Sequence, residues 1–159
     1  MKTRRPRNGS KWLQGKYNPT HPEKYKGTFP IVYRSSLELK FMKFADFNPG
    51  IVQWGSESVI VNYLDQTRKN RNNQPTVHRY YVDFNIQAKQ KDGCIQKFLV
   101  EIKPFGQTQP PQKGRKKEKT FLTEAVTYIR NKCKWEAASA AAEKTGSKFI
   151  IITEKDLPS

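Results

Sequence analysis

The chain has 159 residues and a mass of 18.5 kDa, which suits a single domain with one modest core. Its 30 Lys and Arg residues outnumber 14 Asp and Glu residues, so the formal net charge is +16 and nucleic acid is a better-fitting partner than an anionic membrane. No apolar run approaches the roughly 20 residues that cross a bilayer, which excludes a membrane-spanning class.

Residues 1–30 are predicted to form a basic extended arm ahead of one folded domain over residues 31–159. This segment has eight Lys and Arg residues against Glu23, four prolines that interrupt helices, and four interleaved aromatic residues. Such a segment can grip phosphates or stack on bases, and the alternative is a solubilising tail. The residues expected to bind DNA here are Arg4, Arg5, Arg7 and Lys11.

A helix is predicted next, because Leu37, Phe41 and Phe44 recur at helical spacing after a capping Ser35 or Ser36. Asn48-Pro49-Gly50 should end it. The stretches IVQW and SVIVNYL alternate as strands, and the polar QTRKNRNNQPT stretch is predicted to be a loop.

Two further strands, RYYVDFNIQAK and CIQKFLVEIKP, should form a hairpin around the KDG turn. Residues 104–119 form a basic, Pro- and Gly-rich connection whose expected DNA-binding residues are Lys113, Arg115, Lys116 and Lys117. A long helix over residues 121–144 should end at Gly146 and precede the strand KFIIIT. The positions expected to face inward are Phe121, Ala125, Tyr128, Ile129 and Trp135. The order predicts an α/β fold with a mixed β-sheet flanked by helices.

Asp83 and the Glu101-Ile102-Lys103 tripeptide are the candidate catalytic and metal-binding residues. Glu101 and Lys103 are two residues apart, so they share one face of a strand, and Asp83 lies on the neighbouring strand of the predicted hairpin. Two carboxylates on adjacent strands can hold Mg²⁺, and a nearby lysine can act on the attacking water or on phosphate charge. A solvated strand face is the alternative, but the apolar neighbours make an unpaired carboxylate costly.

Two more carboxylates, Glu38 and Glu57, could contribute or could be ordinary surface residues. A zinc site is not expected, since His21 and His78 stand far apart. Cys94 and Cys133 form no CxxC motif, so free thiols in a reducing compartment are expected.

The segments YRSSLE, HRYYVDF and FLVEIKP, in this order, resemble the PD-(D/E)xK, or restriction-endonuclease-like, nucleases. Within that superfamily the pattern is similar to head completion nucleases of large tailed phages, and more distantly to TnsA transposon end-cleaving subunits. The resemblance covers about residues 15–155 and implies catalytic roles for Glu38, Asp83, Glu101 and Lys103. It also implies Mg²⁺, replaceable by Mn²⁺, on Asp83, Glu101 and the Ile102 carbonyl. Gln107 and Gln109 match a further active-site Gln only loosely.

The resulting hypothesis is a metal-dependent DNA endonuclease that hydrolyses phosphodiester bonds and processes DNA during phage head completion after packaging. Its expected partners are DNA and phage head or portal proteins, with no membrane or small-molecule cofactor, in the host cytoplasm and the virion. No secretory signal is expected, since the amino-terminal residues lack an apolar segment. Two alternatives stay open: a structural DNA-binding head or portal plug without catalysis, and a transposon-type end-cleaving subunit. A general RNA-binding module is disfavoured, since no RNP-like aromatic motif is present.

Overall fold

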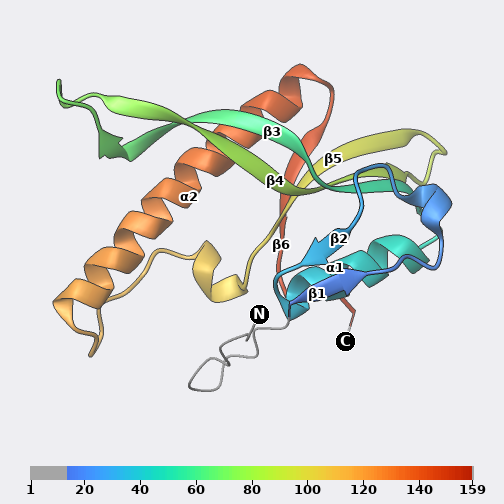
Figure 1. Ribbon diagram of the computed structural model, residues 1–159, viewed down its shortest axis with the longest axis horizontal. Helices are drawn as coiled ribbons and strands as arrows, with labels where there is room; N and C mark the ends of the chain where they lie inside the picture. The colour runs from blue at the N-terminus through green and yellow to red at the C-terminus, as the bar shows by residue number, and fades with distance from the viewer. Residues whose placement is uncertain (1–13, 159) are drawn as a thin grey trace.

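The computed structural model describes residues 14–158, and Figure 1 shows the order of its elements. In chain order these are β1 (Gly15–Tyr17), the 3-10 helix η1 (Pro22–Lys24), β2 (Ile31–Tyr33), α1 (Ser36–Phe47), β3 (Ile51–Lys69), β4 (Pro75–Lys89), β5 (Ile95–Ile102), the 3-10 helix η2 (Phe105–Thr108), α2 (Glu118–Lys144) and β6 (Lys148–Ile152). Strands β3, β4, β5 and β6 form one sheet in that order, and β1 pairs with β2 separately. Because β5 is antiparallel to β4 and parallel to β6, the predicted mixed sheet is confirmed.

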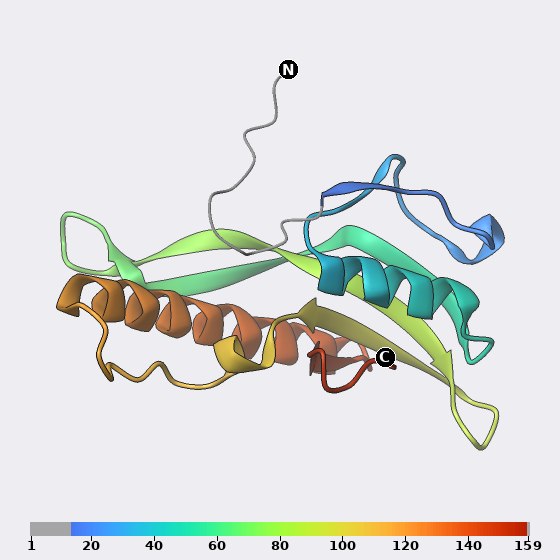
Figure 2. The same ribbon diagram turned by 90° about the horizontal axis from the view of Figure 1, so that it is seen from below.

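Two apolar clusters hold the helices against the sheet. One surrounds Phe41 and Met42 of α1 and includes Trp54, Phe84 and Val100. The other joins Ala138 and Ala142 of α2 to the β3 and β4 residues Val61, Tyr63, Tyr80 and Val82. Figure 2 shows the consequence: α2 runs along the β3–β4 half of the sheet, and α1 lies beside β1 and β2.

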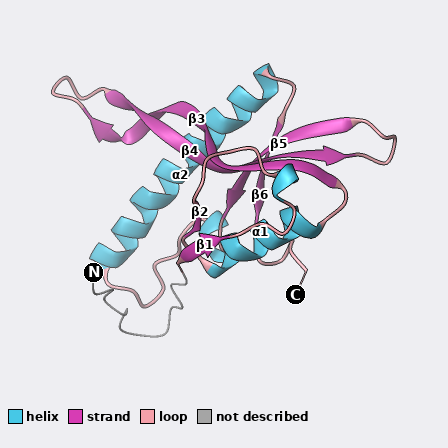
Figure 3. Ribbon diagram, turned by 45° about the vertical axis from the view of Figure 1, so that its right-hand side comes forward, coloured by secondary structure: helices cyan, strands magenta, loops and turns pink. Residues whose placement is uncertain are grey.

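The predicted loop over residues 66–76 is largely strand. β3 continues to Lys69 and β4 begins at Pro75, with Asp65 paired to Thr76 and Lys69 to Pro75. These residues lack the apolar alternation of the core strands because this end of the hairpin pairs with no third strand. The hairpin therefore reaches away from β5 and β6 as a two-stranded ribbon (Figure 3).

The helix predictions hold, with one correction. Ser35 caps α1 by accepting the Glu38 amide, and Gly146, at a positive φ of 71°, follows the end of α2. Ile129 is wrong as an inward position because 48% of it is exposed. The buried stripe of α2 runs through Asn131, Trp135, Ala138 and Ala142, and Ile129 lies two residues from Asn131, on the opposite side of the helix.

Residues 14–30 differ from the predicted extended arm. Tyr17 and Tyr25 are buried in the cluster around α1, where both rings pack against Trp54. The hydroxyl of Tyr17 donates to the buried carboxylate of Asp46 at 2.6 Å, and the Lys24 ammonium donates to three carbonyls at the end of α1. Aromatic residues that could have stacked on bases are therefore part of the core. Arg4, Arg5, Arg7 and Lys11 lie outside the described residues.

In the described part of the chain, neither helix is both long and apolar enough to cross a membrane.

Candidate active site

The candidate site lies where β4 and β5 separate. The two strands pair from Lys89↔Ile95 as far as Phe84↔Val100, and beyond Phe84 strand β4 pairs with β3 alone. Strand β5 continues beside β6 to Ile102. The separation opens a fork in the sheet, and Asp83, Glu101 and Lys103 stand at it, as the predicted hairpin requires.

Asp83 marks the first position at which β4 leaves β5. Its carboxylate accepts the amide of Ile102 at 2.8 Å, which replaces a backbone partner in the ladder. The side chain is partly buried, and burial followed by the negative charge of Glu101 holds the pKa of Asp83 well above its usual range. The side chain of Ile102 packs in the cluster around α1.

Glu101 is buried, with 4% of its surface exposed, yet both of its oxygens are partnered. Its Oε1 lies 3.2 Å from Nζ of Lys103, and its Oε2 accepts the hydroxyl of Tyr80. A buried carboxylate without such partners would be strongly destabilising. The pair of contacts also fixes the direction in which Glu101 points.

Glu38 reaches the site from the first turn of α1. Its carboxylate accepts the amide of Arg34 at 2.6 Å, while Ser35 accepts the amide of Glu38 at 3.0 Å. Burial raises the pKa of Glu38, and the negative charge of Glu38 in turn helps to raise the pKa of Asp83. Glu38 is thus both a helix-capping residue and a member of the electrostatic group around Asp83.

Glu57 is exposed, as a surface residue would be, but it forms an ion pair with Arg34. It sits at a positive φ of 51°, in the irregular part of β3 where the register shifts between Ser56 and Val59. The hydrogen bond to Glu57 raises the pKa of Arg34, which also responds to the charges of Glu38 and Asp83. Arg34 therefore borders the site, and the sequence reasoning did not single it out.

Tyr80 and Lys134 are the other residues that sequence reasoning missed. Tyr80 is an odd number of residues from Asp83, so strand alternation assigns it to the opposite face, and only the fork brings its hydroxyl to Glu101. Lys134, on α2, lies 5.7 Å from the centre of the Tyr80 ring. Burial, then the charge of Lys103, lowers the pKa of Lys134.

The donor set suits a hard divalent cation. Asp83 and Glu101 are two acidic residues at the fork whose charges act on each other, and carboxylate oxygens are the ligands that a hard divalent cation prefers. Among residues 14–158, no group of three or more His, Cys, Asp and Glu side chains is placed to hold a metal ion. Mg²⁺ keeps several of its waters and is commonly held by one or two carboxylates. Burial first and the negative charge of Glu101 second raise the pKa of Asp83, and a bound cation would offset both effects by favouring the charged carboxylate.

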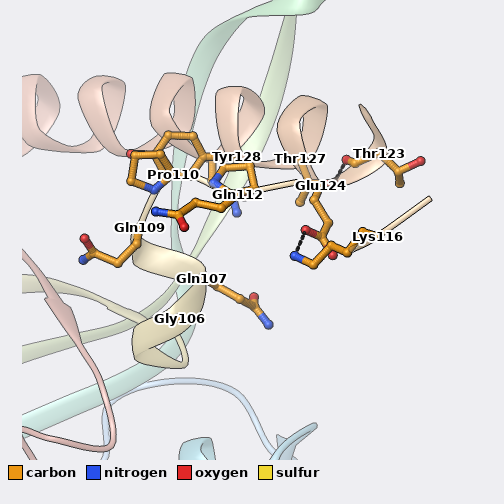
Figure 4. A pocket seen from close by; sticks show the side chains of 12 residues that line it. Gly106, Gln107, Gln109, Pro110, Gln112, Lys116, Thr123, Glu124, Thr127 and Tyr128 are labelled. Carbon is orange, nitrogen blue, oxygen red and sulfur yellow. Dashed lines mark hydrogen bonds and ion pairs between the residues drawn. The ribbon is translucent and has the colours of Figure 1, made fainter. Parts of the chain in front are cut away.

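Gln107 and Gln109 are exposed residues that follow β5. Both line a cavity of about 510 Å³ between η2 and α2, shown in Figure 4. The described residues that line this cavity include none of Glu38, Asp83, Glu101 and Lys103.

The basic connection before α2 is exposed, and Lys116 there forms an ion pair with Glu124 at 2.6 Å.

Comparisons with known proteins give two matches. A family model described as the TnsA-like endonuclease N-terminal domain matches residues 48–154, a range that contains Asp83, Glu101 and Lys103. The head completion nuclease of Enterobacteria phage T4 is 38% identical over 148 residues, which is 90% of this chain and 92% of that protein. Both matches extend across the fork of the sheet.

Proposed function

Since this chain belongs to the TnsA-like endonuclease family, we propose that the fork between β4 and β5 hydrolyses DNA phosphodiester bonds with Mg²⁺ during phage head completion. The observation that carries the proposal is the meeting of Asp83, Glu101 and Lys103 at one point of the sheet. The setting in head completion is supported by the name of the phage T4 relative and its match over most of both chains.

Asp83 and Glu101 would hold the cation, with the Ile102 carbonyl as a third protein ligand. When bound, Mg²⁺ would polarise the phosphate and lower the pKa of a coordinated water. Tyr80 donates to one oxygen of Glu101 and so orients that carboxylate, as outer partners of metal ligands commonly do. Mn²⁺ should replace Mg²⁺, because the same oxygen ligands suit both ions.

Lys103 acts on the substrate side of the site. Its ammonium lies 3.2 Å from Glu101, and its side chain as a whole is three-quarters buried, so its charge is poorly screened by water. From there it can orient the attacking water and offset the negative charge that develops on the phosphate. Glu38 would help to position that water from the α1 side.

The same relationship supports phage head or portal proteins as partners, and the host cytoplasm and virion as places of action. DNA is the proposed substrate. Its phosphates are proposed to contact the basic residues Arg4, Arg5, Arg7, Lys11, Lys113, Arg115, Lys116 and Lys117.

The test separates metal ligands from the lysine. Asp83→Asn and Glu101→Gln should weaken Mg²⁺ and Mn²⁺ binding and sharply reduce nicking of supercoiled plasmid, with partial rescue by Mn²⁺. Lys103→Ala should keep or strengthen metal binding, because a like charge is removed, while nicking falls by about 10²–10⁴-fold. Calorimetric titration and a plasmid-nicking assay measure the two effects.

Matched controls are available on β5 and in the turn between β4 and β5. Lys97→Ala removes an exposed lysine of β5, and Asp92→Asn removes an exposed carboxylate of the β4–β5 turn. Both controls should leave metal binding and nicking unchanged. Full nicking by Asp83→Asn and Glu101→Gln would overturn the active site and favour a DNA-binding head protein without catalysis.

A further inference from the structure

The distal part of the β3–β4 hairpin is a candidate contact surface outside the active site. We define this ribbon as residues 59–82, the part of the hairpin that pairs with no third strand. We propose that its outward face binds duplex DNA on one side of the cleavage point. The inference rests on the proposed DNA endonuclease function and adds where, and how far from the cut, the substrate is held.

The exposed charge of the ribbon has one sign. Its four charged residues besides Asp65 are all basic: Arg68, Lys69, Arg71 and Arg79. Asp65 is fully buried and lies 3.0 Å from Nε of Arg130 and 3.1 Å from Nε of Arg68, so it offers no negative surface. A ribbon of this charge attracts a phosphate backbone and repels basic surfaces.

Hydrogen bonds fix the ribbon at two places, which favours a defined contact with a partner. Arg130 of α2 donates hydrogen bonds to Asp65 and to the hydroxyl of Thr67, and these bonds attach the helix to β3 close to the distal end of the strand. At the tip, Oδ1 of Asn70 accepts the amides of Asn72 and Gln74 at 2.9 and 3.0 Å. Arg71 therefore projects from an ordered turn.

The outward face leads directly to the active site. Residues Val77, Arg79 and Tyr81 are exposed and lie on the same side of β4, two residues apart, and the next residue in that series is Asp83. Their partners across the ribbon are Leu64, Asn62 and Ile60. Arg79 and Asn62 can bond phosphates and base edges, while the apolar pairs on either side can pack against sugars, as apolar side chains of groove-binding proteins do.

The length of the ribbon sets the distance of this contact from the cut. Pro75, at the start of β4, precedes Asp83 by eight residues, which at a strand rise of about 3.3 Å corresponds to about 26 Å. At about 3.4 Å per base pair, a duplex lying along the ribbon would pass Pro75 about eight base pairs from the cleaved phosphate. The start of α2, which follows the basic connection, lies at the same end of the molecule as this tip (Figure 2).

The experiment compares two double variants that remove the same charge. Lys69→Ala with Arg71→Ala alters the tip of the ribbon, and Lys89→Ala with Lys91→Ala alters the exposed β4–β5 turn at the other end of the sheet (Figure 1). Binding to a 30-base-pair duplex is measured by fluorescence anisotropy in EDTA over a range of KCl concentrations. Plasmid nicking in Mg²⁺ is measured in parallel, and circular dichroism checks folding.

The tip variant should lower the slope of log affinity against log salt by about one for each phosphate that the ribbon no longer binds, and the turn variant should leave it unchanged. Arg79→Gln, in the middle of the outward face, should also lower the slope. If the parent neither binds nor nicks DNA, the proposed function itself fails. If the parent does both and the tip variant matches the turn variant, the ribbon proposal is overturned, and its outward face is left as a surface for a protein.

Discussion

Asp83 combines a position needed for metal binding with an unfavourable charge. Its carboxylate is partly buried and faces Glu101, and both effects raise its pKa. A raised pKa means that the folded state binds this proton more tightly than the unfolded chain does. The stability that the proton contributes is therefore present at low pH and is lost as pH rises from the usual Asp range through the raised pKa.

Asp83→Asn should consequently stabilise the metal-free protein at pH 7–8. The variant keeps an oxygen that accepts the Ile102 amide and removes the repulsion with Glu101. Its melting temperature in EDTA should exceed that of the parent, by roughly 2–4 °C for each kcal/mol of repulsion removed. The gain should shrink towards pH 4, and Mg²⁺ should raise the parent's melting temperature more than the variant's. A variant that melts below the parent at every pH would contradict this view of Asp83.

Glu38 has two roles that substitution can separate. Glu38→Gln keeps an acceptor for the Arg34 amide, so its stability should stay within about 0.5 kcal/mol of the parent. Nicking should nevertheless fall at least tenfold, because the variant lacks the negatively charged carboxylate that is proposed to position the attacking water from the α1 side. Ser35→Ala is the converse control: it removes the α1 cap at a cost of about 1 kcal/mol and should leave the nicking rate of folded protein nearly intact. Normal nicking by Glu38→Gln would remove Glu38 from the site.

Among the elements, the segment of residues 14–30 shows how a basic, proline-containing sequence becomes part of a core. Its chain runs so close to β3 that a Cβ on Gly55 would lie 2.6 Å from the carbonyl oxygen of Lys26. The amide of Lys26 also donates to the carbonyl of Trp54 at 2.8 Å. At the other end of the segment, Asp46 of α1 binds Tyr17 and two neighbouring amides.

Asp46→Ala should test whether this docking supports the whole domain. The side chain is fully buried and accepts the Tyr17 hydroxyl and the amides of Thr20 and His21. Its removal leaves three donors without a partner, so the free energy of unfolding should fall by about 3–4 kcal/mol in urea denaturation. Lys16→Ala, on an exposed side chain of the same segment, should cost less than about 0.5 kcal/mol. Equal stability of the two variants would mean that the segment docks without supporting the fold.

At the scale of the whole molecule, the net charge of +16 should make DNA binding largely electrostatic. The buried Tyr17 and Tyr25 limit how the amino-terminal charges can be tested, because a deletion to residue 27 would remove core side chains. A deletion that stops at residue 13 removes Lys2, Arg4, Arg5, Arg7 and Lys11 and leaves every described element in place.

Deleting residues 2–13 should flatten the salt dependence of duplex binding. Each phosphate that the shortened chain no longer binds should reduce the slope of log affinity against log salt by about 0.9. The melting temperature serves as the control for folding, and binding is measured by fluorescence anisotropy in EDTA. An unchanged slope with unchanged melting would show that these residues act as a solubilising tail.

Local patterns of residue type were enough to predict much of the fold and the centre of the candidate site. The cap at Ser35, the stop at Gly146 and the hairpin around the KDG turn all follow from residue types at short spacing. The spacing of Glu101 and Lys103, together with strand alternation, also predicted that their side chains would meet beside Asp83.

Contacts that form where strands part or segments dock could be found only in the folded molecule. Strand alternation assigns Tyr80 to the face opposite Asp83, yet the separation of β4 from β5 lets its hydroxyl reach Glu101. Residues 66–76 lack an apolar period because this end of the hairpin pairs with no third strand, and β3 is held to α2 there by a buried ion pair between Asp65 and Arg130, which are 65 positions apart in the chain. A periodic pattern records the environment of a continuous surface, whereas a fork in a sheet and a distant ion pair depend on how separate elements meet in space.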